Sequence, residues 1–155
     1  MGRKILIVDD HEVMREGVRS LIAKSRQEWT ICGEAASAEE AIHLAQTQKP
    51  DVIVMDLTMP GMSGLEATAR IRGLQLQIPI LIFTMHESER LESDVRGADA
   101  QGYVLKSQAA RDLMLGLECL LQGGTFFGPS SDIEKSERRN PHKGRPFFRL
   151  AFVQS

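Results

Sequence analysis

Acidic, hydroxyl and basic side chains follow separate apolar runs of this 155-residue sequence. Asp9 and Asp10 come after the first run, Asp56 after the third, Thr84 at the end of the fourth, and Lys106 after the fifth. Three carboxylates held close together repel one another, so they attract a cation. Mg²⁺ prefers oxygen ligands, and its charge together with that of the lysine nearly cancels the three negative charges. These residue types therefore predict a magnesium site.

Phosphoryl transfer is the chemistry that such a set of groups supports best. A metal ion, the Lys106 ammonium and the Thr84 hydroxyl are suited to hold the oxygens of a phosphoryl group in transfer. Asp56 is then the attacking carboxylate, because carboxylates form acyl phosphates. Taken singly, these residues have ordinary structural explanations: Asp10 could cap a helix, and Lys106 could be a surface lysine. Their combination after four apolar runs favours the chemical explanation.

The spacing of apolar residues predicts alternating strands and helices up to residue 128. Short apolar runs predict buried parallel strands, and a capping box formed by Ser37 and Glu40 opens the second of five predicted helices. In the first helix, the predicted buried stripe consists of Val13, Met14, Val18, Leu21 and Ile22. The predicted strands are 4–8, 30–34, 52–55, 78–83 and 102–105; the predicted helices are 11–24, 38–48, 63–74, 88–96 and 109–122. Five such units imply a parallel sheet with helices on both faces, whose ligands bind at the carboxyl ends of the strands.

Composition limits the class of protein. The sequence is 42% hydrophobic, which excludes a mainly disordered chain, and no apolar run is long enough to span a membrane. Two cysteines give no disulfide framework, so we expect a cytoplasmic protein. The net charge of −2 gives no basic surface for nucleic acid over the whole chain. Residues 129–155 carry a net +3, three prolines and one glycine, which predicts a poorly ordered basic tail after a domain at 1–128.

Four motifs resemble the receiver domain of bacterial two-component response regulators, and within that family the NarL/LuxR type. They are ILIVDD at 5–10, MDLTMPGMSG at 55–64, FTM at 83–85 and GYVLK at 102–106. The resemblance implies a flavodoxin-like (CheY-like) α/β fold, a doubly wound five-stranded parallel sheet of order 2-1-3-4-5 with five helices. It also implies that a sensor histidine kinase transfers a phosphoryl group to Asp56, and that the chain is a signalling domain rather than a substrate-turnover enzyme.

The resemblance assigns a role to each matching position. Mg²⁺ (or Mn²⁺) would be held by Asp9, Asp10, Asp56 and the backbone carbonyl of Thr58. Lys106 would pair with the carboxylate and then with the phosphoryl group, Thr84 would turn toward the phosphoryl oxygens, and Tyr103 would move with it from an exposed to a buried position. Thr58 and His86 stand two residues after Asp56 and Thr84, where they are candidates for tuning the lifetime of the phosphorylated state.

Other features bear on conformation and output. Gly64 is expected to relieve a strained turn after Asp56. Asp99 stands where the family usually has a glycine, which predicts a fourth helix that is loose at its end or shifted toward Gly97. We expect output through the face of the fourth and fifth helices, with homodimers formed there or through the first and fifth helices.

About 27 residues after position 128 are too few for the family's helix-turn-helix domain, so no DNA-binding domain is expected in this chain. Three alternatives remain open: a truncated NarL/LuxR-type DNA-binding transcriptional regulator, a phosphatase or hydrolase of small substrates, and a pseudo-receiver that only binds partners.

Overall fold

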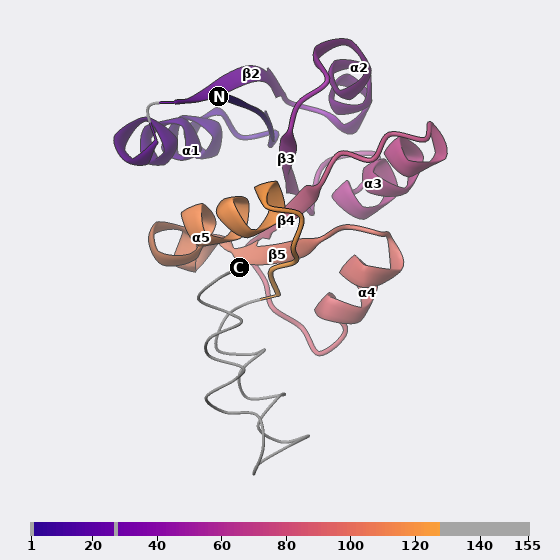
Figure 1. Ribbon diagram of the computed structural model, residues 1–155. Helices are drawn as coiled ribbons and strands as arrows, with labels where there is room; N and C mark the ends of the chain where they lie inside the picture. The colour runs from indigo at the N-terminus through magenta and orange to yellow at the C-terminus, as the bar shows by residue number, and fades with distance from the viewer. Residues whose placement is uncertain (1, 27, 128–155) are drawn as a thin grey trace.

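The computed structural model describes residues 2–26 and 28–127 as a five-stranded parallel sheet between two layers of helices (Figure 1). The sheet has the order β2-β1-β3-β4-β5, which confirms the predicted topology. The strands are β1 (Arg3–Val8), β2 (Trp29–Ala35), β3 (Val52–Asp56), β4 (Ile80–Thr84) and β5 (Gly102–Leu105). The helices are α1 (Glu12–Ser25), α2 (Ala38–Gln48), α3 (Gly64–Gly73), α4 (Leu91–Gly97) and α5 (Ala109–Leu121), with a short 3₁₀ turn, η1 (Lys106–Gln108), before α5.

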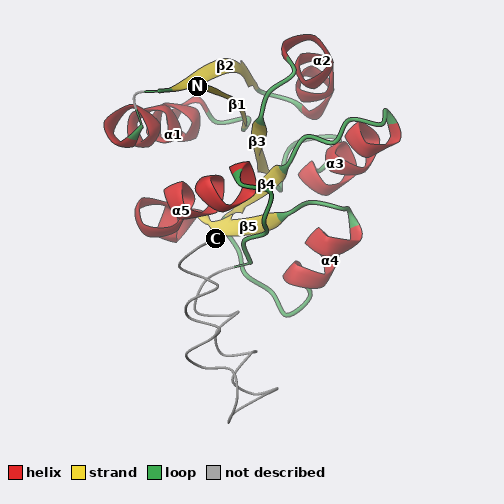
Figure 2. Ribbon diagram, in the orientation of Figure 1, coloured by secondary structure: helices red, strands yellow, loops and turns green. Residues whose placement is uncertain are grey.

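Each face of the sheet has its own hydrophobic core. Successive strand side chains point to opposite faces, so Ile5 and Ile7 of β1 pack toward α1 and α5. Leu6 and Val8 face the core that the other three helices cover. Figure 2 shows α1 and α5 on one side of the strands and α2, α3 and α4 on the other. This burial on both faces explains the nearly continuous Val, Ile and Leu runs of the strands.

Serine side chains fix where two of the helices begin. Ser37 Oγ accepts a hydrogen bond from the Glu40 amide at 3.2 Å, and the Glu40 carboxylate accepts one from the Ala36 amide at 2.9 Å. The predicted cap of α2 by Ser37 is therefore confirmed, and Glu40 reaches the amide one residue before the cap instead of the amide of Ser37 itself. Ser63 Oγ accepts from the Glu66 amide at 3.1 Å and caps α3 in the same way. Both helices are thus anchored directly after the loops that leave β2 and β3.

Two details of the helix predictions are wrong. Val13 was predicted in the buried stripe of α1, but its side chain is 77% exposed. At 3.6 residues per turn, Val13 lies about 140° around the helix from the buried Val18, whereas Met14 lies only about 40° away. The fourth helix was predicted from residue 88 but begins at Leu91, the first apolar side chain of this segment that is buried.

The backbone adopts the left-handed conformation just after α4 and just after α5. α4 ends at Gly97, one residue beyond the predicted bound and at the second of the two predicted possibilities, and Asp99 adopts the left-handed conformation with φ of 66°. After α5, Gly123 has φ of 89° and turns the chain back along β5. There the Phe126 carbonyl accepts a hydrogen bond from the Tyr103 amide at 2.9 Å. Phe126 therefore covers the edge of the sheet that β5 would otherwise expose.

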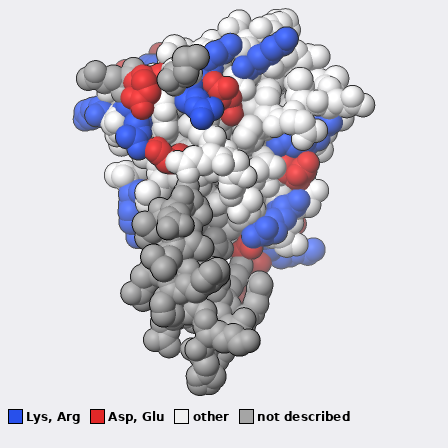
Figure 3. All heavy atoms as spheres, in the orientation of Figure 1, with Lys and Arg blue, Asp and Glu red and all other residues white. Residues whose placement is uncertain are grey.

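The distribution of charged side chains on the surface agrees with the modest net charge of the chain. Basic and acidic side chains are interspersed over the described part of the face seen in Figure 3. Within residues 2–26 and 28–127, no helix combines the length and apolar character that a membrane crossing requires. The predicted domain boundary at 128 and the predicted basic tail at 129–155 lie outside the described residues.

Candidate phosphoryl-transfer site at the carboxyl end of the sheet

The carboxyl ends of four strands bring the chemically active residues together. In the parallel register, Val8 pairs with Met55, which places Asp9 beside Asp56 at the end of the two central strands. Asp56 pairs with Phe83, and so Thr84 lies one residue beyond it on the next strand. This register is the physical reason why residues nearly fifty positions apart in the sequence share one site.

Lys106 lies inside the site and bridges two of its carboxylates. Its Nζ donates a hydrogen bond to Asp9 Oδ2 at 2.8 Å and lies 3.2 Å from Asp56 Oδ1. The lysine side chain is only 7% exposed, so this is a buried ion-pair cluster rather than a surface contact. Burial acts to lower the pKa of Lys106, but the hydrogen bond to Asp9 and the charges of Asp56 and Asp9 outweigh it and raise the pKa.

The surroundings of Asp56 disfavour the ionised form of its carboxyl group and raise its pKa. Burial raises the pKa of its carboxyl group, and the nearby Asp9 charge raises it further. Lys106 and a weak hydrogen bond from the Thr58 amide, 3.4 Å from Asp56 Oδ1, oppose this effect. The result is a pKa raised to about 6. The positive charge of Lys106 thus offsets only part of the effect of burial and of the Asp9 charge on Asp56.

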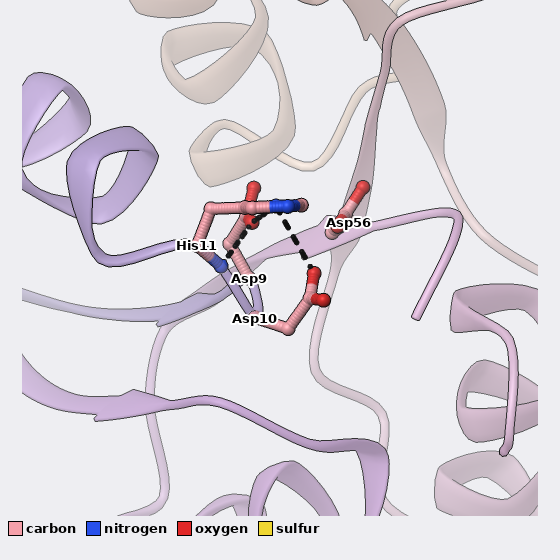
Figure 4. Close-up of side chains that lie close together, drawn as sticks. All are labelled: Asp9, Asp10, His11 and Asp56. Carbon is pink, nitrogen blue, oxygen red and sulfur yellow. Dashed lines mark hydrogen bonds and ion pairs between the residues drawn. The ribbon is translucent and has the colours of Figure 1, made fainter. Parts of the chain in front are cut away.

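The loop between β1 and α1 turns its acidic residues inward. The His11 amide donates to Asp9 Oδ1 at 2.9 Å. The His11 ring contributes Nδ1, which lies 3.2 Å from Asp9 Oδ1 and 3.2 Å from Asp10 Oδ1 (Figure 4). Arg15, one turn into α1, donates to the Asp9 carbonyl at 2.5 Å, and its Nε lies 3.0 Å from Glu34 Oε1 on β2. The loop is therefore fixed at both its backbone and its side chains.

The donor set fits a divalent cation. Among the described residues, two buried carboxylate oxygens accept no hydrogen bond: Asp10 Oδ1 and Asp56 Oδ2. One donor atom from each of Asp9, Asp10, His11 and Asp56 lies within 4.8 Å of the others. Within the described part of the chain, Asp56 Oδ2 has no hydrogen-bond partner, and Asp10 Oδ1 has only the ion-pair contact with the His11 ring; a cation between the carboxylates would compensate their charge. The acidic cluster predicted from the sequence is thus present and has the ligand chemistry of a metal site.

The loop after β3 passes close to Asp56. The Gly64 amide donates to the Leu57 carbonyl at 2.8 Å, and a Cβ atom at Gly64 would overlap the Asp56 carbonyl oxygen. Gly64 was predicted to relieve a strained turn, which is wrong, because the left-handed residue of this loop is Gly61, with φ of 85°. Gly64 is instead required by the close approach of two backbone segments.

The remaining predicted residues divide into buried and exposed groups. Thr84 is buried, and its Oγ1 accepts a long hydrogen bond, 3.4 Å, from the His86 amide. Thr58 and His86 have exposed side chains at the edge of the site. Tyr103 is buried, with its ring centroid 6.0 Å from that of Phe127 in an edge-to-face contact. Its predicted role as a moving switch remains a prediction, and here it occupies the buried position.

Three contributors to the site were not identified from the sequence. His11 was not singled out as a site residue, although its place directly after two aspartates was a signal. Arg15 was not singled out either, but its spacing of one helical turn from the loop allows the contact with the Asp9 carbonyl. Phe127 gave no signal, because its contacts with Tyr103 and with the Arg96 guanidinium, 3.8 Å away, depend on tertiary folding.

Comparison with known proteins agrees with this geometry. Residues 5–118 match the family model described as the response regulator receiver domain. The chain is 41% identical over 115 residues to the nitrate/nitrite response regulator protein NarL of Escherichia coli K12, covering 73% of this chain and 52% of that protein. It is 39% identical over 126 residues to the transcriptional regulatory protein YdfI of Bacillus subtilis, covering 81% of this chain and 58% of that protein. It therefore spans about half the length of these relatives.

A solved structure shows the same likeness in three dimensions. The two-component response regulator of the LuxR family from Aurantimonas sp. SI85-9A1 superposes with a TM-score of 0.81 at 40% identity, covering 90% of this chain and 99% of that one. The family match, the strand order and the acidic cluster all identify the same kind of signalling domain. The chain belongs to the response regulator receiver domain family, and its relatives are of the NarL/LuxR type.

Proposed function

We propose that the domain receives a phosphoryl group on Asp56 from a sensor histidine kinase in a Mg²⁺-dependent reaction. The main observation in support is that one Asp56 oxygen, Oδ2, is buried without a hydrogen-bond partner, while Oδ1 lies 3.2 Å from Lys106 Nζ. An oxygen without a partner has its lone pairs available to attack phosphorus. Lys106 keeps the carboxyl group ionised and is placed to neutralise the transferred group.

In the proposed step, Asp56 Oδ2 attacks the phosphorus of a phosphohistidine. The new bond joins the carboxylate oxygen to phosphorus, the nitrogen–phosphorus bond breaks, and the histidine ring leaves with the bonding electron pair and takes up a proton. Mg²⁺ would be held by Asp9, Asp10, Asp56 and the Thr58 carbonyl, and would supply charge neutralisation for the phosphoryl oxygens. The protein itself contributes position: the loop fixed by Arg15 holds Asp9 and Asp10 in place.

We propose Thr84 and Tyr103 as the conformational response. Thr84 lies at the end of β4 with a buried hydroxyl whose hydrogen bond with the His86 amide is long, which suits reorientation toward a phosphoryl oxygen. Tyr103 lies on the neighbouring strand β5. Both residues would then shift a pre-existing equilibrium rather than create a new state. Thr58 and His86, exposed at the edge of the site, are proposed to set how readily water hydrolyses the acyl phosphate.

Acetyl phosphate tests the transfer without a kinase. We expect intact-mass spectrometry to show one added phosphoryl group in the presence of Mg²⁺ and none after addition of a chelator. Asp56→Asn should abolish the adduct, whereas Asp94→Asn, an exposed aspartate on α4, should leave it unchanged. An adduct that persists in Asp56→Asn, or its absence in the folded wild-type protein, would refute Asp56 as the acceptor.

A second proposal concerns output. The named relatives are a transcriptional regulatory protein and a nitrate/nitrite response regulator, so we propose that this receiver controls transcription in the cytoplasm. Self-association on phosphorylation is the proposed means, and Leu115, half-exposed on α5, supports a contact surface there. Light scattering before and after acetyl phosphate treatment tests this: an unchanged mass at high protein concentration would count against dimerisation.

A further inference from the structure

A short segment after α5, residues 124–127, returns to the sheet and runs beside β5 (Figure 1). We call this segment the strap. The Phe126 amide donates a hydrogen bond to the Gln101 carbonyl at 3.0 Å, and the Phe126 carbonyl accepts one from the Tyr103 amide at 2.9 Å. Because both hydrogen bonds join the strap to β5 or to the residue before it, exchange of these two amides with solvent measures how firmly the strap is docked.

Two glycines form the seat on which the strap lies. A Cβ atom at Gly102 of β5 would overlap the Phe126 carbonyl, and a Cβ atom at Gly116 of α5 would lie 3.1 Å from the Phe126 ring. A side chain at either position would therefore press against the strap. The Phe126 side chain itself is only 2% exposed. This fit of backbone and ring is that of a built docking site.

The two aromatic side chains of the strap enter opposite cores. Phe126 belongs to the core between the sheet and the α1–α5 layer, whereas Phe127, 1% exposed, belongs to the core that α2, α3 and α4 cover. The Phe127 ring packs edge to face on Tyr103, with 6.0 Å between the ring centroids. The Arg96 guanidinium lies 3.8 Å from the Phe127 ring centroid. Phe127 thus joins the strap to the residue proposed above as the conformational switch.

We propose that Tyr103 controls, through Phe127, how firmly the strap holds to β5, and that phosphorylation of Asp56 tightens this docking. The inference rests on the proposed function and extends it to the segment by which the chain leaves the domain. In the buried position seen here, the Tyr103 ring forms one wall of the Phe127 site. An outward turn of Tyr103 would remove that wall. Whatever stabilises the buried Tyr103 therefore stabilises the docked strap, and the coupling is reciprocal.

The strap is placed to carry this change beyond the domain. The sequence continues from Phe127 into residues 128–155, so the strap links the receiver to the segment that follows it. Its two hydrogen bonds and two buried rings hold that link to one edge of the sheet. A firmer strap would fix the starting point of the following segment, and a looser strap would release it.

Amide hydrogen exchange of the full chain, followed by NMR, tests the coupling. The Tyr103 and Phe126 amides report the strap, and the Asp51 amide, bonded to the Lys4 carbonyl at 2.7 Å beside the start of β3, is the reference. In the presence of Mg²⁺, acetyl phosphate should slow exchange of the two strap amides by roughly two- to tenfold, the range that one edge-to-face aromatic contact supplies. Exchange at Asp51 should not change.

Phe127→Leu and Phe126→Leu form a matched pair, because each keeps a buried apolar side chain in the strap. Both should speed exchange of the strap amides, since leucine fills less of either site. Phe126→Leu should still show slower exchange on phosphorylation. Phe127→Leu should lose that response, because Phe127 makes the edge-to-face contact with Tyr103.

Arg96→Gln tests the same site from the surface and leaves both cores intact. Loss of the guanidinium over Phe127 should speed exchange of the strap amides by roughly two- to fivefold, the range of an exposed cation–π contact. Arg70→Gln is the control, because both arginines are exposed and each pairs with a glutamate one turn earlier, Glu92 for Arg96 and Glu66 for Arg70. Arg70→Gln should leave the strap amides unchanged.

The proposal fails if intact mass shows the phosphoryl adduct while the strap amides exchange as before or faster. It also fails if Phe127→Leu and Phe126→Leu respond alike to phosphorylation, or if Arg96→Gln changes the strap amides no more than Arg70→Gln does. Each of these results leaves the proposed function intact. Absence of the adduct in the folded protein refutes the proposed function and, with it, the control of the strap by phosphorylation.

Discussion

Asp56→Asn should make the folded protein more stable at neutral pH when divalent cations are removed. Burial and the charge of Asp9 raise the pKa of Asp56 from 3.8 to about 6. The unfolded chain has no such penalty, so it loses this proton at lower pH than the folded protein does. The folded state therefore loses stability as the pH rises from about 4 to 6, and the loss is complete above that range.

The size of the effect follows from the two pKa values. At about 1.4 kcal/mol per pH unit, the gap corresponds to roughly 3 kcal/mol at pH 7.5 and about 1 kcal/mol at pH 4.5. Asparagine has the shape of the carboxyl group without its charge, so Asp56→Asn should recover most of this free energy. Lys106 retains Asp9 as its partner in the variant, which limits new penalties.

Urea unfolding at pH 7.5 and pH 4.5 in the presence of a chelator provides the measurement. Circular dichroism and the fluorescence of the single tryptophan, Trp29, report the transition. We expect a stability gain for Asp56→Asn that shrinks from pH 7.5 to pH 4.5, and no gain for the exposed control Asp94→Asn. Adding Mg²⁺ should close the gap, because a bound cation favours the ionised carboxylate. An Asp56→Asn protein no more stable than wild type at pH 7.5, or a gain independent of pH, would refute the electrostatic argument.

Three further substitutions test other parts of the structure by the same unfolding measurement. Lys106→Met should cost about 3 kcal/mol at pH 7.5 and less at pH 4.5, because it leaves buried carboxylates, Asp56 among them, without their counter-charge; a loss that does not depend on pH would contradict this. Gly64→Ala should cost about 1–3 kcal/mol, because its Cβ would overlap backbone, whereas Gly73→Ala, with open space around it, should be nearly neutral. Phe127→Ala should cost about 3–5 kcal/mol, since the ring is buried; a loss below 1 kcal/mol would show that its contacts matter little.

The fold could be predicted from the sequence because local signals and tertiary structure agree. Strands buried on both faces leave continuous apolar runs, as in β3, and the Ser37–Glu40 capping box marks the beginning of α2 within the sequence itself. The site could be predicted for a related reason. Parallel strands end at one edge, so residues that follow apolar runs, such as Asp56 and Lys106, necessarily meet.

What the sequence did not predict depends on contacts between distant segments. Val13 is an exception: it satisfies the apolar pattern in type, but its angle of about 140° from Val18 already follows from helical periodicity. Gly64 looks like a turn residue, but the Asp56 carbonyl that excludes a side chain there lies eight positions earlier in the sequence. The contact of Phe127 with Tyr103 requires the chain to turn back along β5 after α5. No local pattern encodes such an approach.

The site combines strong positioning with incomplete charge compensation, and both properties follow from the fold. The strands, the Arg15 contact and the close approach at Gly64 hold Asp9, Asp10 and Asp56 together despite their repulsion. Lys106 leaves a formal charge of about −2 on this group when all three are ionised, which equals the charge that one divalent ion neutralises. The folding free energy of the whole domain thus maintains an arrangement that the four side chains alone would not adopt. Such a site responds to a cation or a phosphoryl group because either one relieves a repulsion that the fold already sustains.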